Sequence, residues 1–223
     1  MLRAKLKRLF NPVRWHQLRS VKPVSNVFGF DRGTPVDRYY IEKFLKQNSK
    51  LIAGDVLEIA SDDYCKQFGS NIKRQHILHY DNSNPKATIV GDLSNSSTLP
   101  ANTIDCFVCT QTFNFIYDFR KAIEGAHHLL KKDGVLLATV AGLSQISRYD
   151  MDRWGDFWRF TTKSAEQAFA DVFGKQNVTI GQFGNVLSAT ALLQGISKEE
   201  LTEEELDVVD HDYQLIITIV ARK

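Results

Sequence analysis

Short apolar segments that end on or close to an acidic residue recur through the first half of this chain. They span residues 55–60, 76–81 and 87–90, and their acids are Glu58, Asp81 and Asp92. Apolar runs of this length are typical of strands that are buried on both faces of a sheet. Because both faces of such a sheet must be covered, the connecting segments are expected to be helices.

Segments with helical periodicity do alternate with these strands. Helices are expected at 35–46, 122–130 and 164–173, and further strands at 104–110, 135–140, 178–182 and 215–221. The second helix is expected to stop at the turn Lys131-Lys132-Asp133-Gly134, since bases in a last turn and a following glycine are common stop signals. This order predicts an α/β fold with a parallel sheet and helices on both faces.

The three acids lie where such a fold binds its ligands. In an open parallel sheet, ligands bind beyond the carboxyl ends of the strands, near the point where the strand order reverses. Glu58 and Asp81 are one strand–helix–strand unit apart, a spacing at which the second acid can accept hydrogen bonds from both hydroxyls of a ribose. Asp92 is expected to accept from an adenine amino group, with Leu93 packed on the ring. The pattern therefore predicts a ligand that contains adenosine.

Several segments carry a family resemblance. They are Val56-Leu57-Glu58-Ile59, Gly91-Asp92-Leu93, Asp105-Cys106-Phe107-Val108 and the run from Ala126 to Leu137. In them the chain resembles the class I S-adenosylmethionine-dependent methyltransferases. The resemblance implies a Rossmann-like sandwich with a mostly parallel seven-stranded sheet, and S-adenosylmethionine as the cofactor. The cofactor-binding residues are then expected to be Glu58, Ala60, Ser61, Asp62, Asp81, Asn82, Asp92, Leu93, Thr110 and Gln111.

The first loop departs from the family pattern. Ala60 and Asp62 stand where the motif E-x-G-x-G-x-G has its first two glycines. Glycine there lets the backbone approach the ligand and take a positive φ. Asp62 adds an anion that an ammonium group of the cofactor could pair with. The loss of glycines also disfavours a dinucleotide, whose pyrophosphate needs a glycine-rich turn. A non-catalytic scaffold with this fold stays open as an alternative.

A narrower resemblance concerns the substrate. The segments 32–42, 158–161 and 184–187 look like those of methyltransferases found alongside glycosyltransferases in polysaccharide synthesis. This implies O-methylation of a sugar or polysaccharide precursor, a small-molecule or glycan substrate. Arg32, Tyr39, Trp158 and Arg159 are the expected substrate-binding residues. An insert at about 143–163, rich in Trp, Arg and Asp, is expected to cap the site, and a simple packed loop is the alternative.

Two residues are candidates for the general base that a hydroxyl acceptor would need. His211 lies between Asp210 and Asp212, either of which could orient its imidazole. Asp156 lies in the expected capping insert. A structural role remains the alternative for His211. No compact cluster of His, Asp and Glu residues suggests a metal site.

The charge is uneven along the chain. Residues 1–30 carry seven bases and no acid, while residues 31–223, the expected single domain, carry 21 bases and 26 acids. The basic arm is compatible with a solvated segment, an organelle transit peptide, nucleic acid, or peripheral membrane contact through residues 1–22. Nucleic acid, and with it a nucleic-acid methyltransferase, is the least favoured because the domain is acidic. Three cysteines and no signal peptide pattern favour a reducing cytoplasm, with contact to the inner face of a membrane as a variant. The oligomeric state is left without a prediction.

Overall fold

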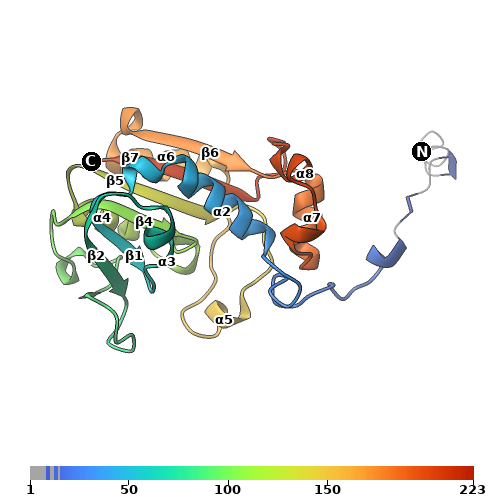
Figure 1. The fold of residues 1–223 in the computed structure, drawn as a ribbon, viewed down its shortest axis with the longest axis horizontal. Coiled ribbons are helices and arrows are strands. Elements are labelled where there is room, and N and C mark those ends of the chain that lie inside the picture. Colours follow the sequence, from blue (N-terminus) through green and yellow to red (C-terminus); the bar gives the residue numbers. More distant parts are fainter. Residues whose placement is uncertain (1–8, 11–12, 15) are drawn as a thin grey trace.

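One seven-stranded sheet forms the centre of the molecule. The structure, a computed structural model, describes residues 9–10, 13–14 and 16–223. The strands are β1 (Gly54–Ile59), β2 (Ile72–His79), β3 (Ile89–Val90), β4 (Ile104–Thr110), β5 (Leu130–Ala141), β6 (Val178–Phe183) and β7 (Ile216–Arg222). They lie in the order β3-β2-β1-β4-β5-β7-β6, and β7 runs antiparallel to the other six strands (Figure 1). The predicted mostly parallel sheet is confirmed.

Helices cover both faces of the sheet. They are α2 (Val36–Gln47), α3 (Asp63–Phe68), α4 (Phe119–Leu129), α5 (Arg148–Met151), α6 (Thr162–Phe173), α7 (Val186–Gln194) and α8 (Glu203–Asp207). Short 3-10 turns are η1 (His16–Leu18), η2 (Ser49–Leu51), η3 (Ser96–Thr98), η4 (Phe113–Phe115), η5 (Lys175–Asn177) and η6 (Lys198–Glu200). The three helices expected from periodicity are present as α2, α4 and α6.

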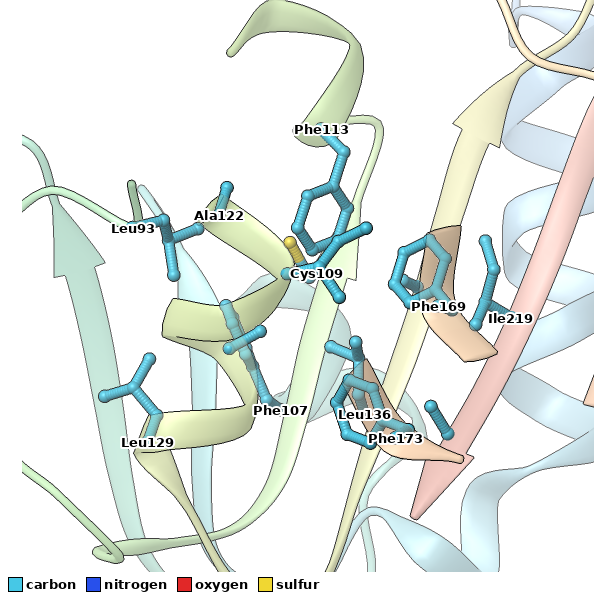
Figure 2. Packing of buried hydrophobic residues seen from close by; sticks show 14 of the residues in the cluster. Leu93, Phe107, Cys109, Phe113, Ala122, Leu129, Leu136, Phe169, Phe173 and Ile219 are labelled. Carbon is cyan, nitrogen blue, oxygen red and sulfur yellow. The ribbon is translucent and has the colours of Figure 1, made fainter. Parts of the chain in front are cut away.

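The core consists of two layers, one on each side of the sheet. On one side α4 and α6 pack against Phe107 and Leu136, and the rings of Phe113 and Phe169 meet edge to face with centroids 5.3 Å apart (Figure 2). On the other side α2 and α3 pack against Val56 and neighbouring strand residues. Each large apolar side chain fully buried in this way contributes about 1.5–3 kcal/mol.

Strand alternation places Cys106 and Cys109, which have a C-x-x-C spacing in β4, on opposite faces of the sheet. Successive side chains of a strand point to opposite faces, so residues three apart lie on different sides of the sheet. Cys109 belongs to the α4–α6 layer and Cys106 to the α2–α3 layer. Burial raises the pKa of each thiol to about 12. Both cysteines are therefore core residues.

The junction between α4 and β5 differs from the prediction. The helix ends at Leu129 and β5 begins at Leu130, so Lys131 and Lys132 are strand residues rather than a helix stop. The extra residues are absorbed by an irregularity in the β4–β5 pairing, where Asp133 takes a φ of 65°. A positive φ is tolerated by Asp better than by most residues, which is why a bulge forms here without glycine.

Ion pairs close the amino edge of the sheet. Asp55 of β1 is almost fully buried and pairs with Arg74 of β2 and with Lys131 of β5, at 2.7 Å in each case. Lys131 also contacts Asp105 of β4 at 2.9 Å. Hydrogen bonds from Arg74 and Lys131 hold the pKa of Asp55 well below its usual range. Four neighbouring strands are thereby tied together at the edge opposite to the predicted site.

Candidate functional site

The predicted site residues gather at the carboxyl edge of the sheet. β1 pairs with β2 on one side and with β4 on the other, and all three strands are parallel. From β1 the sheet continues through β2 to β3, and from β4 it continues to β5. The strand order therefore reverses between β1 and β4, which is where ligands bind in open α/β sheets.

Glu58 braces the first loop from inside the protein. Its side chain is 3% exposed, and its carboxylate accepts hydrogen bonds from the backbone N–H groups of Tyr64 (3.3 Å) and Cys65 (2.9 Å) in the first turn of α3. Burial raises the pKa of this carboxyl group, while the two N–H groups oppose that rise. Glu58 thus fixes the path of the loop by holding the start of the next helix.

The two missing glycines have different structural consequences. Ala60 takes a φ of 61°, the left-handed conformation for which the family uses glycine. Asp62 has a φ of −125°, an ordinary value that places no demand for glycine. Its carboxylate pairs with Lys66 at 2.7 Å, and Ser61 donates its N–H to the carbonyl of Ile59. The backbone therefore follows the course expected of a glycine loop, with one added methyl group at Ala60.

The loop after β2 carries the predicted ribose-binding acid. Asp81 lies two residues beyond the strand, is exposed, and accepts the N–H of Ser83 at 2.9 Å. Hydrogen bonds from Ser83 are the main reason that its pKa is lowered. Asn84 donates to the carbonyl of Ala60 at 2.8 Å, which joins this loop to the first one. Asn82 is exposed beside Asp81.

The loop after β3 holds the other predicted adenosine ligand. Asp92 accepts hydrogen bonds from both the N–H and the hydroxyl of Ser94, each at 2.8 Å. Leu93 is buried in the core beside Leu99 and lies against α4. Its packing on an adenine ring stays a prediction. Among the described residues, Glu58, Asp81 and Asp92 form no ion pair with a Lys or Arg, in contrast to the acids of the amino edge.

The loop after β4 lies next to the first loop. Thr110 ends the strand, and Gln111 follows with a φ of 49° while its N–H donates to the carbonyl of Thr139. Asn114, in the 3-10 turn η4, is 2% exposed, and its Oδ1 has no hydrogen-bond partner among the described residues. Asn114 was not among the site residues expected from the sequence. The available signal was a lone amide among phenylalanines beyond a strand that ends at the expected site.

The segment after β5 is held closed by an internal ion pair. Arg159 contacts both oxygens of Asp156, whose side chain is 1% exposed, and one of these oxygens also accepts the N–H of Ser147. The charged groups of Asp156 and Arg159 are therefore paired with each other. The catalytic role of Asp156 and the substrate role of Arg159 stay predictions, and these contacts favour a structural one.

Aromatic rings are exposed around this closed segment. Trp158 donates its indole N–H to the carbonyl of Tyr117, and the Tyr117 ring meets that of Phe157 with centroids 5.4 Å apart. Tyr117 is 72% exposed, and Tyr149 and Trp154 are exposed as well. The structure thus brings the predicted Trp158 together with a row of rings from two loops.

Arg32 and Tyr39 lie elsewhere, on the contact between α2 and the acidic segment around α8. Arg32 forms a two-point ion pair with Glu200, and Tyr39 donates its hydroxyl to Asp207 at 2.7 Å. Burial and the Asp207 carboxylate raise the pKa of Tyr39. Both predicted substrate residues therefore hold the N-terminal helix in place, and a contact with substrate stays a prediction.

His211 is brought to the carboxyl edge by the antiparallel last strand. The start of β7 pairs with the end of β5, through Ile216 and Ala141. The side chain of His211 is exposed, and its carbonyl accepts a hydrogen bond from Gln214. Across the residues that the structure describes, no group of three His, Cys, Asp or Glu side chains is arranged to hold a metal ion.

The comparisons with known proteins agree with this geometry. A family model described as a methyltransferase domain matches residues 40–138, which include β1 to β4 and most of β5. Residues 40–138 are thus similar to a methyltransferase domain. S-adenosylmethionine is the cofactor that such domains take, and the acids at the strand ends lie within the matched segment. No curated protein matches the chain.

Solved structures share the fold of this chain. An S-adenosylmethionine-dependent methyltransferase from Archaeoglobus fulgidus has a TM-score of 0.54 at 13% identity, over 83% of this chain and 94% of that one. Phosphoethanolamine N-methyltransferase 2 of Haemonchus contortus, in complex with S-adenosylmethionine, has a TM-score of 0.51 at 13% identity, over 83% of this chain and 52% of that one. The [4+2]-cyclase SpnF has a TM-score of 0.52 at 15% identity, over 82% of this chain and 80% of that one.

These matches confirm the predicted fold class and agree with the predicted enzyme type and cofactor. The cyclase shows that proteins of this fold also carry other chemistry, so the acceptor must be argued from the site itself.

Proposed function

We propose that the chain transfers a methyl group from S-adenosylmethionine to a hydroxyl of a sugar or polysaccharide precursor. The cofactor supplies the methyl group on a positively charged sulfur. The observation that carries the proposal is the contrast between the two edges of the sheet. Acids at the amino edge are neutralised by Arg74 and Lys131, whereas the acids at three neighbouring strand ends of the carboxyl edge pair with no Lys or Arg among the described residues, and among basic groups Asp81 contacts only the imidazole of His79, at 3.1 Å.

Each acid of the carboxyl edge suits one part of the cofactor. Asp81 is exposed and ionised, so both of its oxygens can accept hydrogen bonds from ribose hydroxyls. Asp92 is placed one strand further out, where an adenine amino group is expected. Glu58 acts through the loop whose path it fixes. The backbone of Ala60 and Ser61 in that loop is expected to face the cofactor. The amino-acid end of the cofactor is expected between the ends of β1 and β4, a region bordered by Asp62, Thr110 and Gln111.

The acceptor class rests on the aromatic rings of the loops after β4 and β5. Tyr117, Phe157 and Trp158 come from the loops after β4 and β5, the side away from the adenosine acids. Exposed aromatic rings pack on the apolar faces of sugar rings and leave the hydroxyls free for polar groups. Such a surface favours a cyclic polyol over a charged or extended acceptor.

His211 is our candidate for the group that removes the proton of the hydroxyl. It is exposed at the same edge, and a neutral imidazole can accept a proton near neutral pH. Asp156 is less suited, because Arg159 and the N–H of Ser147 lower the pKa of its buried carboxyl against the effect of burial.

Peripheral contact with a membrane is a further part of the proposal. The predicted segment, residues 1–22, lies partly outside the described residues. In the described part, Phe10, Val13 and Val21 are exposed together with the bases Arg14 and Arg19, and this segment extends away from the domain beyond α7 and α8 (Figure 1). Exposed apolar side chains among bases suit an anionic lipid surface. None of the helices in the described part of the chain is long and apolar enough to cross a membrane.

Radiolabel transfer tests the acceptor class. The protein is incubated with methyl-labelled S-adenosylmethionine and, separately, with nucleotide sugars, isolated polysaccharide, and total RNA. We expect label in a carbohydrate fraction that base-stable O-methyl sugar analysis identifies, and less label with the variant His211→Ala. Label in RNA, or no label in any fraction from protein that binds the cofactor, would contradict the sugar proposal.

A further inference from the structure

The imidazole of His79 lies against the predicted ribose-binding acid at the end of β2. Its Nδ1 is 3.1 Å from Oδ1 of Asp81 and 3.0 Å from the carbonyl oxygen of the same residue. The side chain of His79 is 19% exposed and that of Asp81 is 59% exposed, so the imidazole contacts the carboxylate from the protein side. The contact therefore leaves the solvent side of the carboxylate open to a ligand.

Nδ1 of His79 carries a proton in this arrangement. Two oxygen acceptors of Asp81 lie at hydrogen-bond distance from this nitrogen, whereas the backbone N–H of Asp81 is further away, at 3.4 Å. An unprotonated Nδ1 would turn its lone pair toward both oxygens, while Nδ1–H donates to them. The imidazolium and the neutral tautomer with hydrogen on Nδ1 both supply this donor. His79 therefore holds the carboxylate of Asp81 in either protonation state.

The sheet fixes the backbone of His79. Its carbonyl accepts the N–H of Gly91, and the carbonyl of Leu78 before it accepts the N–H of Ala60, each at 3.0 Å. The end of β2 is thus tied to the first loop on one side and to the loop after β3 on the other. Asp81 lies beyond the strand in a surface loop. The imidazole therefore gives the carboxylate of this loop a fixed position relative to the sheet.

Two donors of the protein hold the same oxygen of Asp81. Oδ1 accepts hydrogen bonds from Nδ1 of His79 and from the N–H of Ser83, at 3.1 and 2.9 Å. Both contacts restrict the rotation of an otherwise exposed carboxylate and leave Oδ2 for the hydroxyl groups of a ligand. Because a side chain that is already ordered loses less entropy when a ligand binds, this arrangement favours binding.

We propose that His79 is a positioning residue for the cofactor, with Nδ1–H directing the carboxylate of Asp81 toward the ribose hydroxyls. This inference rests on the proposed function and adds to it the group that holds the ribose-binding acid in place. The ribose contacts Asp81, and His79 acts through that residue alone. The effect of replacing His79 must therefore depend on the presence of Asp81.

A double-mutant cycle measured with S-adenosylhomocysteine tests this role. Titration calorimetry is expected to show that His79→Leu lowers the affinity about threefold to tenfold, the range of one hydrogen bond. In the Asp81→Ala background the same replacement should change the affinity by less than about twofold, because the carboxylate that His79 positions is gone. His79→Asn should restore the wild-type affinity, since the amide of Asn places an N–H close to the position of Nδ1–H. His79→Gln should not, because its longer side chain places the amide near the position of Nε2.

His76→Leu is the matched control, because His76 lies on the same strand and its imidazole contacts the hydroxyl of Thr88 at 3.4 Å. It should leave the affinity unchanged, and these variants should unfold close to the wild-type temperature. Should His79→Leu not fold, the comparison of His79→Asn with His79→Gln gives the same test.

Equal affinities of His79→Leu and wild type, or an equal loss with and without Asp81, would overturn the inference. If Asp81→Ala weakens binding in that case, the proposed function stands and the inference alone fails. Folded wild-type protein that does not bind S-adenosylhomocysteine would refute the proposed function itself, and the inference with it.

Discussion

Arg159 and Asp156 form a two-point ion pair, with Nη1 and Nη2 at 2.5 and 2.9 Å from the two carboxylate oxygens. The two residues are three positions apart in the sequence, so the ion pair joins two points of the segment that follows β5. The N–H of Ser147 donates to the same carboxylate from the start of α5. The segment expected to cap the site is therefore a loop with its own internal ion pair.

Asp156→Asn should destabilise the protein in a pH-dependent way. At pH 7 the variant leaves the Arg159 charge without its partner, at a cost of about 2 kcal/mol, since Arg159 is partly exposed. The pKa of Asp156 is lowered in the folded state, so its stabilisation is present above the unfolded value of about 4 and is lost as the pH falls below it. Urea unfolding at pH 7 and pH 3 measures this difference.

The exposed pair Lys163–Glu166 provides the control for this prediction. Lys163→Ala should change the free energy of unfolding by less than about 0.5 kcal/mol. An Asp156→Asn variant that is as stable as the wild type at pH 7 would show that the loop does not depend on the ion pair.

Glu58→Ala should loosen the first loop. The buried N–H groups of Tyr64 and Cys65 lose their acceptor, and we expect a loss of about 2–4 kcal/mol in the free energy of unfolding. The affinity for S-adenosylhomocysteine should fall at least about tenfold, because the loop is no longer held. Calorimetry and urea unfolding provide the two measurements. The exposed Glu124→Ala should change neither, and equal affinities of Glu58→Ala and wild type would refute the bracing role.

Ala60→Gly should make the protein slightly more stable. A left-handed φ costs an alanine about 1–2 kcal/mol, while glycine adds unfolded-state entropy worth about 0.4–1 kcal/mol. The difference corresponds to a rise of about 1–3 °C in the unfolding temperature. Ala101→Gly, at an exposed turn without a positive φ, should lower that temperature instead. A fall for Ala60→Gly as well would mean that the left-handed conformation is not strained.

Reversal of charge in the arm should abolish membrane binding. The triple variant Arg14→Glu, Arg19→Glu, Lys22→Glu removes the exposed bases of the described arm. Wild-type protein is expected to sediment with phosphatidylglycerol vesicles at low salt and less at high salt, because exposed charges are screened. The variant should stay in the supernatant, and neither protein should sediment with phosphatidylcholine. Wild-type protein that sediments with neither kind of vesicle would contradict the membrane proposal.

Sequence analysis predicted the elements that depend on local pattern. Buried strands have short apolar runs and helices have a periodic stripe, so β1, β4, α4 and α6 were found close to their true bounds. The left-handed backbone at Ala60 was not predicted, because a residue other than glycine rarely takes a positive φ. The position of Asp81 and Asp92 at one edge followed from the parallel order of the strands.

Contacts between residues far apart in the sequence could not be predicted. Arg32 meets Glu200, and Tyr39 meets Asp207, each across 168 residues. A sequence shows that these side chains are charged or polar, but their partners depend on how residues 32–47 pack against residues 198–207. Asn114 was missed for a related reason, since its lack of a partner is a property of the packed structure. The bulge at Asp133 was read as a helix stop because both need the same residue types.

Binding of S-adenosylhomocysteine to wild-type protein and to Asp81→Ala tests the central claim most directly. Asp81 is exposed, so its removal should leave the unfolding temperature unchanged, and Asp152→Ala serves as an exposed control. The account predicts that the wild type binds, that Asp152→Ala binds equally well, and that Asp81→Ala binds about tenfold to a hundredfold more weakly. Folded wild-type protein that shows no binding in the calorimeter, or an Asp81→Ala variant that binds as tightly as the wild type, would contradict it.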